Sequence, residues 1–121
     1  MFGFSRPSGP QVTRLAPGEA IAQAADGALV VIDVREAAEL AASGKAAGAH
    51  HVPLGIVAVR CHPSAPDLPA GLSLEQPIAV YCAAGGRSQK AAEMLVQMGY
   101  ETVYNIGGFG DWTSAGGPVE R

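Results

Sequence analysis

The chain has 121 residues, of which 48% are hydrophobic and 16% are charged, and its formal net charge is −3. That length predicts one domain with its own core, and the apolar share is too high for a disordered chain. The mild acidity argues against a general nucleic-acid binder, which carries a basic stripe. No apolar run reaches the roughly 18 residues of a membrane span. We therefore expect neither nucleic acid nor a membrane among the partners.

The ends of the chain suggest how it is organised. Residues 1–10 mix Gly, Ser and Pro and are expected to form a flexible lead-in, with one domain over residues 11–121. The start has no apolar stretch after a basic one, so we expect no signal peptide. Two cysteines do not make a disulfide framework. These features predict a cytoplasmic protein with free thiols, and residues 116–121 are expected to form a surface tail.

The elements expected from periodicity and from capping residues alternate between helices and strands. In chain order they are a helix over 17–25, a strand over 29–34, a helix over 35–42 ended by Ser43-Gly44, a surface loop over 62–69, a strand over 77–82, a helix from Ser88 to Met98 ended by Gly99, and a strand over 103–106 bounded by Gly107-Gly108. This alternation predicts an α/β domain with a mostly parallel sheet. Ligands of such sheets bind beyond the carboxyl ends of the strands.

One loop has the composition of a reactive site. Cys82 is the last residue of the predicted strand over 77–82, and Arg87 stands just before the cap of the next helix. A helix N-terminus and a nearby arginine both lower the pKa of a thiol, which reacts as the thiolate. Small residues between them let successive backbone N–H groups turn inward as an anion nest. These residues are Ala83, Ala84, Gly85 and Gly86.

The same residues also have a purely structural explanation. A free cysteine is often only a small buried hydrophobe, and two glycines after a strand are often only a turn. A strand, a thiol, a nest, an arginine with forked donors and a helix in succession are a much more specific pattern. The pattern therefore favours a nucleophilic cysteine.

Four segments together resemble the rhodanese-like sulfurtransferases. Residues 82–87 are similar to that family's Cys-x-x-Gly-x-Arg active-site loop, and residues 31–36 to its Asp-x-Arg segment. Residues 48–54 are similar to its Gly-Ala-x-x-Ile-Pro-Leu stretch, and residues 107–119 to its carboxyl-terminal Gly-Gly-x-x-x-Trp signature. The resemblance spans nearly the whole chain. It implies a rhodanese-like fold, with a central, mostly parallel five-stranded sheet and helices on both faces.

The resemblance also implies a reaction. Cys82 would be the catalytic nucleophile, assisted by Arg87, and would carry the sulfur as a covalent persulfide, so no cofactor is expected. The donor would be a small sulfane-sulfur compound such as thiosulfate, and the acceptor cyanide, a thiol or a sulfur-accepting protein. Backbone N–H groups from Ala83 to Ser88 would bind the persulfide and the donor. Efficient thiosulfate users in the family often carry basic residues where this loop has Ala83 and Ala84.

Two other functions stay open at this stage. A non-catalytic rhodanese-like module would bind or carry sulfur for a partner. A phosphatase or arsenate reductase would use a related loop, but those loops enclose five residues, whereas Cys82 and Arg87 enclose four. This loop also contains no acidic residue to protonate a leaving group, which favours sulfur chemistry.

Supporting roles are expected for several residues outside the loop. Asp33 follows a strand and precedes a helix, so it is expected to cap that helix or to brace the active-site loop. Arg35 is expected to pair with a carboxylate as part of the scaffold. Arg60 is a candidate for substrate binding, with a solvated surface charge as the alternative. Trp112 is expected to be a core anchor.

Cys61 allows two further hypotheses. It would resolve a Cys82 persulfide into a disulfide if the two Cα atoms lay within about 7 Å. It would bind zinc together with the histidines of the chain, His50, His51 and His62, but their spacing matches no common zinc pattern. We therefore expect no metal, and an ordinary loop position for Cys61.

Overall fold

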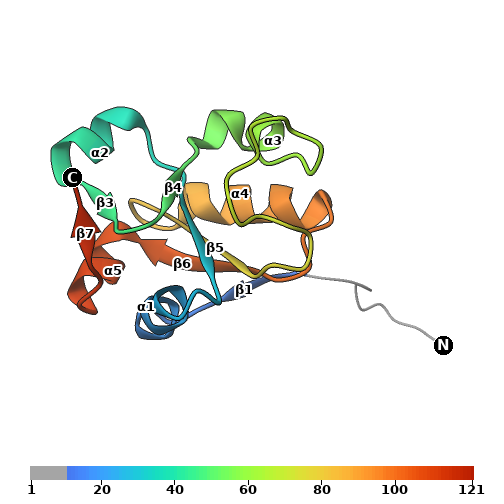
Figure 1. The fold of residues 1–121 in the computed structure, drawn as a ribbon. Helices are drawn as coiled ribbons and strands as arrows, with labels where there is room; N and C mark the ends of the chain where they lie inside the picture. Colours follow the sequence, from blue (N-terminus) through green and yellow to red (C-terminus); the bar gives the residue numbers. More distant parts are fainter. Residues whose placement is uncertain (1–10) are drawn as a thin grey trace.

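The computed structural model describes residues 11–121, and the expected lead-in over residues 1–10 lies outside the described residues. Within them, five strands form one sheet in the order β1-β6-β5-β2-β4, and all its neighbouring strands are parallel (Figure 1). The strands are β1 (Val12–Arg14), β2 (Val30–Asp33), β4 (His50–His51), β5 (Ile78–Cys82) and β6 (Val103–Gly108). The predicted parallel sheet of five strands is confirmed.

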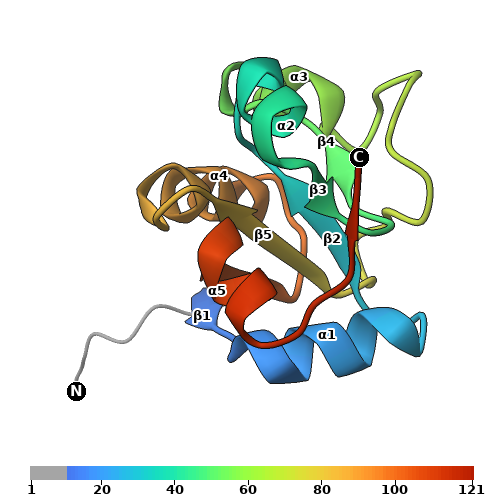
Figure 2. The same ribbon diagram turned by 90° about the vertical axis from the view of Figure 1, so that its left-hand side faces the viewer.

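Helices cover both faces of this sheet (Figure 2). They are α1 (Pro17–Ala25), α2 (Ala37–Ser43), α3 (Val57–Arg60) with the short 3₁₀ turn η1 (Leu54–Ile56) before it, α4 (Gly86–Gln97) and α5 (Phe109–Ser114). The views place α1 and α5 on one face, and α2, α3 and α4 on the other. The domain therefore has the three layers expected of an α/β fold.

The central strand β5 contributes to two hydrophobic cores. Because side chains alternate along a strand, Ile78, Val80 and Cys82 pack against Leu95 and the rest of α4. Ala79 and Tyr81 point to the opposite core, which contains Trp112 of α5. All five residues of β5 are buried, as the unbroken apolar sequence predicted. This alternation places the Cys82 side chain on the face covered by α4.

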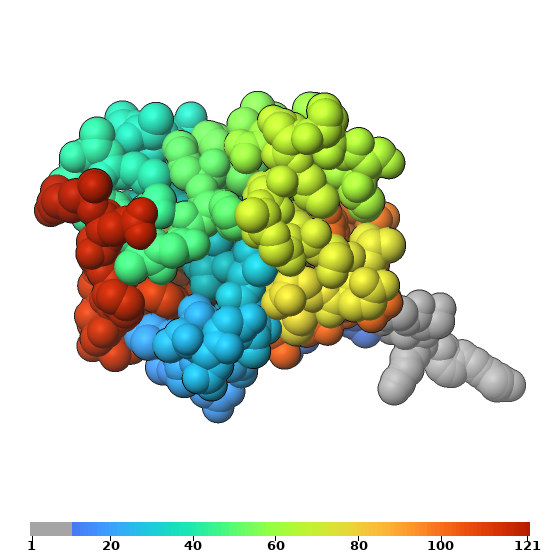
Figure 3. Space-filling view, viewed as in Figure 1, coloured from blue at the N-terminus to red at the C-terminus, as the bar shows by residue number. Residues whose placement is uncertain are grey.

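The carboxyl-terminal segment pairs with another part of the chain. Residues Val119–Glu120 form strand β7, which pairs antiparallel with β3 (Lys45–Ala46). Figure 3 shows this end of the chain lying against the segment around β3. The Lys45 Nζ atom contacts a Glu120 carboxylate oxygen at 2.8 Å. The segment is exposed as expected, but its pairing with β3 was not predicted, because it joins residues more than 70 positions apart, which no local pattern reveals.

The predicted element boundaries are confirmed at glycines that end helices, and α1 matches its prediction fully. Gly44, with φ of 78°, follows α2, and Gly99, with φ of 106°, follows α4. The helix predicted from Arg35 begins instead at Ala37, because the backbone N–H of Arg35 bonds the Asp33 carboxylate. The loop over 62–69 is confirmed as irregular and mostly exposed.

Over residues 11–121, no helix combines the length and the apolar character needed to cross a membrane. In the same range, no three His, Cys, Asp or Glu side chains lie together in a way that could hold a metal ion.

The turn after α5 sets a strict limit on side-chain size. The buried Trp112 indole donates its N–H to the Pro118 carbonyl at 2.9 Å, and Gly117 packs against the same ring. A Cβ at Gly117 would lie 2.5 Å from Trp112 Cδ1. We expect Gly117→Ala to lower the free energy of unfolding by about 1–3 kcal/mol, because the core has no room for the methyl group. Urea unfolding followed by fluorescence measures this.

The matched control for Gly117→Ala is Gly110→Ala in α5. A Cβ at Gly110 meets no atom within 4 Å, and alanine favours helix over glycine by roughly 0.5–1 kcal/mol. Gly110→Ala is therefore expected to keep or raise the stability. Equal stability of the two variants would contradict the packing described for Trp112.

Candidate active site

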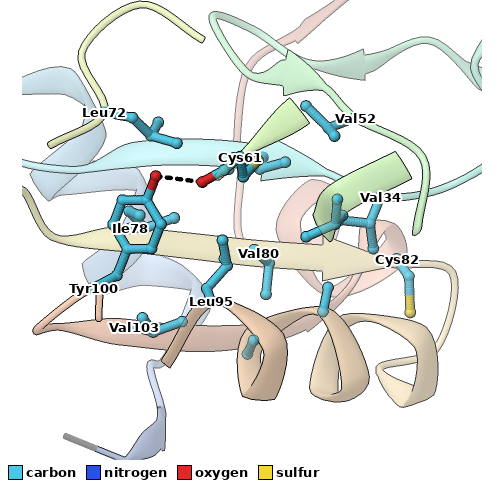
Figure 4. Packing of buried hydrophobic residues seen from close by; sticks show 14 residues of the cluster. Val34, Val52, Cys61, Leu72, Ile78, Val80, Cys82, Leu95, Tyr100 and Val103 are labelled. Carbon is cyan, nitrogen blue, oxygen red and sulfur yellow. Dashed lines mark hydrogen bonds between the residues drawn. The ribbon is translucent and has the colours of Figure 1, made fainter. Parts of the chain in front are cut away.

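Cys82 ends β5, and its side chain lies beside the first turn of α4 (Figure 4). The residue is 1% exposed. Its Sγ atom accepts hydrogen bonds from the Gly85 backbone N–H at 3.0 Å and from the Ser88 backbone N–H at 3.4 Å. The Ser88 Oγ atom is a third neighbour of the sulfur, at 3.4 Å. The expected nest therefore surrounds the thiol, with donors from the loop and from the helix.

These contacts shift the titration of the thiol. Burial by itself raises the pKa of Cys82, since it disfavours the charged thiolate. Hydrogen bonds from the Ser88 hydroxyl, the Ser88 and Gly85 backbones and the Ala84 backbone outweigh burial, so the pKa of Cys82 lies below its ordinary value. A dry site whose donors stabilise the thiolate is the environment that a nucleophilic cysteine needs.

The first turn of α4 differs from the prediction. Helix α4 begins at Gly86 instead of after a Ser88 cap, and the N-cap is Gly85, whose φ of 107° is a conformation that glycine adopts without strain. Ser88 is fully buried, and its hydroxyl lies 2.8 Å from Asn105 Oδ1. The helix begins earlier than predicted because the loop turns at Gly85. Ser88 therefore lies within the first turn of the helix, where its side chain faces the sulfur.

Asn105 of β6 is a part of the site that the sequence did not reveal. Its Oδ1 atom accepts from the Gly107 backbone N–H at 3.0 Å and lies 2.8 Å from the Ser88 hydroxyl, whose single proton this oxygen shares with the Cys82 sulfur. Its Nδ2 group donates to the Gly85 carbonyl at 3.2 Å and to Gln89 Oε1 at 3.1 Å. Every polar group of this buried amide is thus bonded, and it joins the loop, α4 and β6. The one feature of the sequence that could have indicated this role is the presence of an asparagine within an otherwise apolar strand.

The loop also packs closely on the end of β6. The structure places the Ala83 backbone against Gly108, where a Cβ would lie 3.1 Å from the Ala83 carbonyl carbon and closer still to its oxygen. The register between β5 and β6 shifts at Val80/Tyr81, so that Cys82 lies opposite Gly108. The expectation that Gly107-Gly108 bounds the strand was wrong, because both residues belong to β6. Their missing side chains leave space for the loop.

Arg87 is engaged by a residue of another helix. Its two Nη atoms donate to the two carboxylate oxygens of Glu39 in α2, at 2.7 and 2.9 Å. This side-chain hydrogen bond lowers the pKa of Glu39 to about 2, and it raises the pKa of Arg87 above its ordinary value. The sequence named Arg87 but not Glu39, which lies 48 positions away.

Asp33 and Arg35 form a buried pair next to the site. The Arg35 Nη2 atom lies 2.8 Å from Asp33 Oδ2, and both side chains are at most 4% exposed. The Tyr81 hydroxyl donates to the same carboxylate at 2.6 Å. The carboxylate expected beside Arg35 is thus Asp33, whereas the cap expected of Asp33 is not formed, because Glu36 is the N-cap of α2. Through the Tyr81 hydroxyl, the pair connects β2 to the residue that precedes Cys82 in β5.

Arg60 ends α3, and Cys61 follows it. Arg60 pairs with Asp67 at 3.2 Å. The Cys61 carbonyl accepts from the Tyr100 hydroxyl, and Tyr100 follows the carboxyl end of α4, whereas Cys82 precedes its amino end (Figure 4). The twelve residues of α4 span about 18 Å. The structure therefore places Cys61 away from Cys82, and the resolving-cysteine hypothesis has no geometric support, whereas the expected substrate contact of Arg60 stays a prediction.

Cys61 and the three histidines have separate partners. Burial raises the pKa of the Cys61 thiol to about 11. The Nε2 atoms of His50 and His51 lie within hydrogen-bond distance of the carbonyls of Ala70 and Arg35, and His62 Nδ1 accepts from the Ser64 backbone. These residues hold loops in place.

The comparisons with known proteins agree with this geometry. Residues 16–115 match the rhodanese-like domain family. The chain is 39% identical over 102 residues to the thiosulfate sulfurtransferase GlpE of Pseudomonas entomophila, with 84% of each protein covered. Its fold is similar to that of a Rhodopseudomonas palustris protein described as a possible tyrosine phosphatase, at 34% identity and a TM-score of 0.79, over 90% of this chain and 85% of that one.

A third comparison is with a rhodanese solved with anions, from E. coli. It is 34% identical to this chain, with a TM-score of 0.57, and the match covers 69% of this chain and 91% of that one. Together, the family match over most of the chain and the curated relatives identify the loop from Cys82 to Arg87 as part of a known domain. The chain belongs to the rhodanese-like family and is a thiosulfate sulfurtransferase-like transferase.

Proposed function

We propose that this protein transfers sulfane sulfur through a persulfide on Cys82. The observation that supports the proposal most strongly is the set of donors around the Sγ atom, from Gly85 and Ser88. They stabilise a thiolate at the end of a buried strand, where the thiol would otherwise be inert. The thiosulfate sulfurtransferases among the relatives supply the donor chemistry.

The first half-reaction forms the persulfide. The Cys82 thiolate attacks the outer sulfur of thiosulfate, a new sulfur–sulfur bond forms, and the bond to the sulfonate sulfur breaks. Sulfite leaves with that electron pair, and the terminal sulfur on Cys82 keeps one negative charge. The first turn of a helix has N–H groups without carbonyl partners, and in α4 this turn, beginning at Gly86, lies next to Sγ. These groups bind the new charge.

The second half-reaction returns the thiolate. Cyanide, or the thiolate of a small molecule or of a protein, attacks the terminal sulfur and leaves with it, and the electron pair returns to Cys82 Sγ. The cycle is a ping-pong reaction with a covalent intermediate. The sulfur rests on the protein between the two steps, so no cofactor is required.

The relative described as a possible tyrosine phosphatase raises a second candidate function. Hydrolysis of a phosphate ester needs an acid to protonate the leaving oxygen. The carboxylate that contacts the loop arginine, Glu39, has a pKa of about 2 and is ionised at neutral pH. The loop itself encloses four residues without an acid. Sulfur transfer is therefore favoured, and turnover of an aryl phosphate without transfer of sulfur would reverse the choice.

Intact mass spectrometry tests the persulfide. We expect the protein to gain one sulfur atom on incubation with thiosulfate and to lose it when cyanide is added, because each half-reaction is independent of the other. Cys82→Ser should gain nothing. Cys61→Ser is the matched control and should gain sulfur like the unaltered protein, since Cys61 is buried away from the loop.

Two results would count against this account. An adduct that persists in Cys82→Ser would place the sulfur elsewhere. An adduct that yields no more than one thiocyanate per chain, with both substrates in excess, would indicate a sulfur carrier or binding module instead of an enzyme.

The pH profile of Cys82 alkylation by iodoacetamide tests the thiolate. Because its pKa is lowered, the thiolate persists to lower pH, and the alkylation rate should reach half its plateau below the ordinary thiol value of about 8.5. Ser88→Ala removes the hydroxyl that lies 3.4 Å from Sγ, so its midpoint should move upward. Cys61, with a pKa of about 11, should not contribute in this range.

Ser114→Ala, an exposed serine of α5, is the control for the Ser88 variant. Its alkylation midpoint should equal that of the unaltered protein. A Ser88→Ala midpoint at or below that value would contradict the role assigned to the hydroxyl.

A further inference from the structure

The ion pair between Arg87 and Glu39 affects how the site binds the sulfur donor. The guanidinium has five N–H groups, and Glu39 accepts two of them through both of its oxygens. Three N–H groups therefore remain to contact a substrate. The positive charge of Arg87, by contrast, is matched by a carboxylate in direct contact. Arg87 keeps its own charge, but the Arg87–Glu39 pair as a whole carries no net charge.

The other charges around the loop do not restore a positive site. Residues 83–86 carry no charge. The acidic side chain of Glu36 lies close enough to act on Arg87, as does the Cys82 thiolate. Arg35 is buried against Asp33, and Arg60 pairs with Asp67. Lys90, one turn along α4, is exposed. A dianion that approaches Cys82 thus meets backbone N–H groups, whereas the charged side chains around them largely balance one another.

We propose that Glu39 is a specificity-determining residue of the sulfur donor site: by neutralising Arg87 it weakens the binding of dianionic donors, such as thiosulfate, relative to monoanionic donors with the same reacting sulfur. The inference rests on the proposed function. Both side chains are about one-third exposed (34% and 33%), so water and salt screen their interaction. The preference is therefore expected to be severalfold and not absolute.

Glu39→Gln separates the charge of this residue from its structural role. Glu39 Oε1 accepts the backbone N–H of Glu36 at 2.9 Å, a contact that belongs to the cap of α2. A glutamine keeps an oxygen for that bond and for one Arg87 N–H, but it removes the negative charge. The control is Glu36→Gln, which removes the same charge from the same helix without touching the pair with Arg87.

Protection of Cys82 against iodoacetamide measures anion binding without any sulfur transfer. The probes are sulfate, a dianion, and methanesulfonate, a monoanion of similar shape, at constant ionic strength. In Glu39→Gln we expect the apparent Kd of sulfate to fall by about 5-fold, and that of methanesulfonate by about 2-fold, since the gain scales with ligand charge. Glu36→Gln should give less than half the effect on sulfate.

Three results would overturn the proposal: an unchanged or weaker affinity for sulfate in Glu39→Gln, equal gains for both anions, or an equal gain in Glu36→Gln. The kinetic counterpart compares thiosulfate with methanethiosulfonate, a monoanion that gives the same persulfide and releases methanesulfinate. Glu39→Gln should lower KM for thiosulfate more than for methanethiosulfonate, with kcat within about 2-fold. Absence of turnover with both donors would contradict the proposed function, whereas the protection experiment decides the role of Glu39 by itself.

Discussion

The side-chain amide of Asn105, buried between β6 and α4, is the contact on which the arrangement of the site depends. It bonds the Gly85 carbonyl in the loop, Ser88 and Gln89 in the helix, and Gly107 at the irregular end of β6. A buried amide with a missing partner is costly, so the four bonds form together or not at all. Through them, a strand of the sheet fixes the loop that surrounds the Cys82 sulfur.

The chemistry follows from two opposing effects on that sulfur. Burial alone would keep Cys82 protonated, whereas donors from Gly85 and Ser88 stabilise the thiolate and prevail. The positive charge of Arg87 could also stabilise the thiolate, but it is balanced by the carboxylate of Glu39. The site therefore acts through oriented hydrogen bonds more than through net charge. This is consistent with a loop that has alanines at positions 83 and 84.

Local patterns were sufficient for the framework of the fold but not for its long-range contacts. The alternation of strands and helices predicted the parallel sheet, and the place of Cys82 at the end of a strand predicted a thiol beside a helix N-terminus. Two contacts were not predicted: the ion pair of Arg87 with Glu39 and the pairing of β7 with β3. Each joins segments 48 or more residues apart. Ser88 was misread as a cap, since its hydroxyl bonds a side chain of a later strand. Arg60 was expected to bind substrate, and its observed partner, Asp67, is seven residues away in an exposed loop.

Sulfur is proposed to rest covalently on Cys82 between two separate half-reactions. Rapid mixing of the protein with thiosulfate in the absence of any acceptor tests it most directly, with sulfite measured against time. The account predicts a burst of one sulfite per chain, which then stops because every Cys82 carries a persulfide. Sulfite that appears only after cyanide or a thiol is added would contradict the account, because donor and acceptor would then have to react together on the protein.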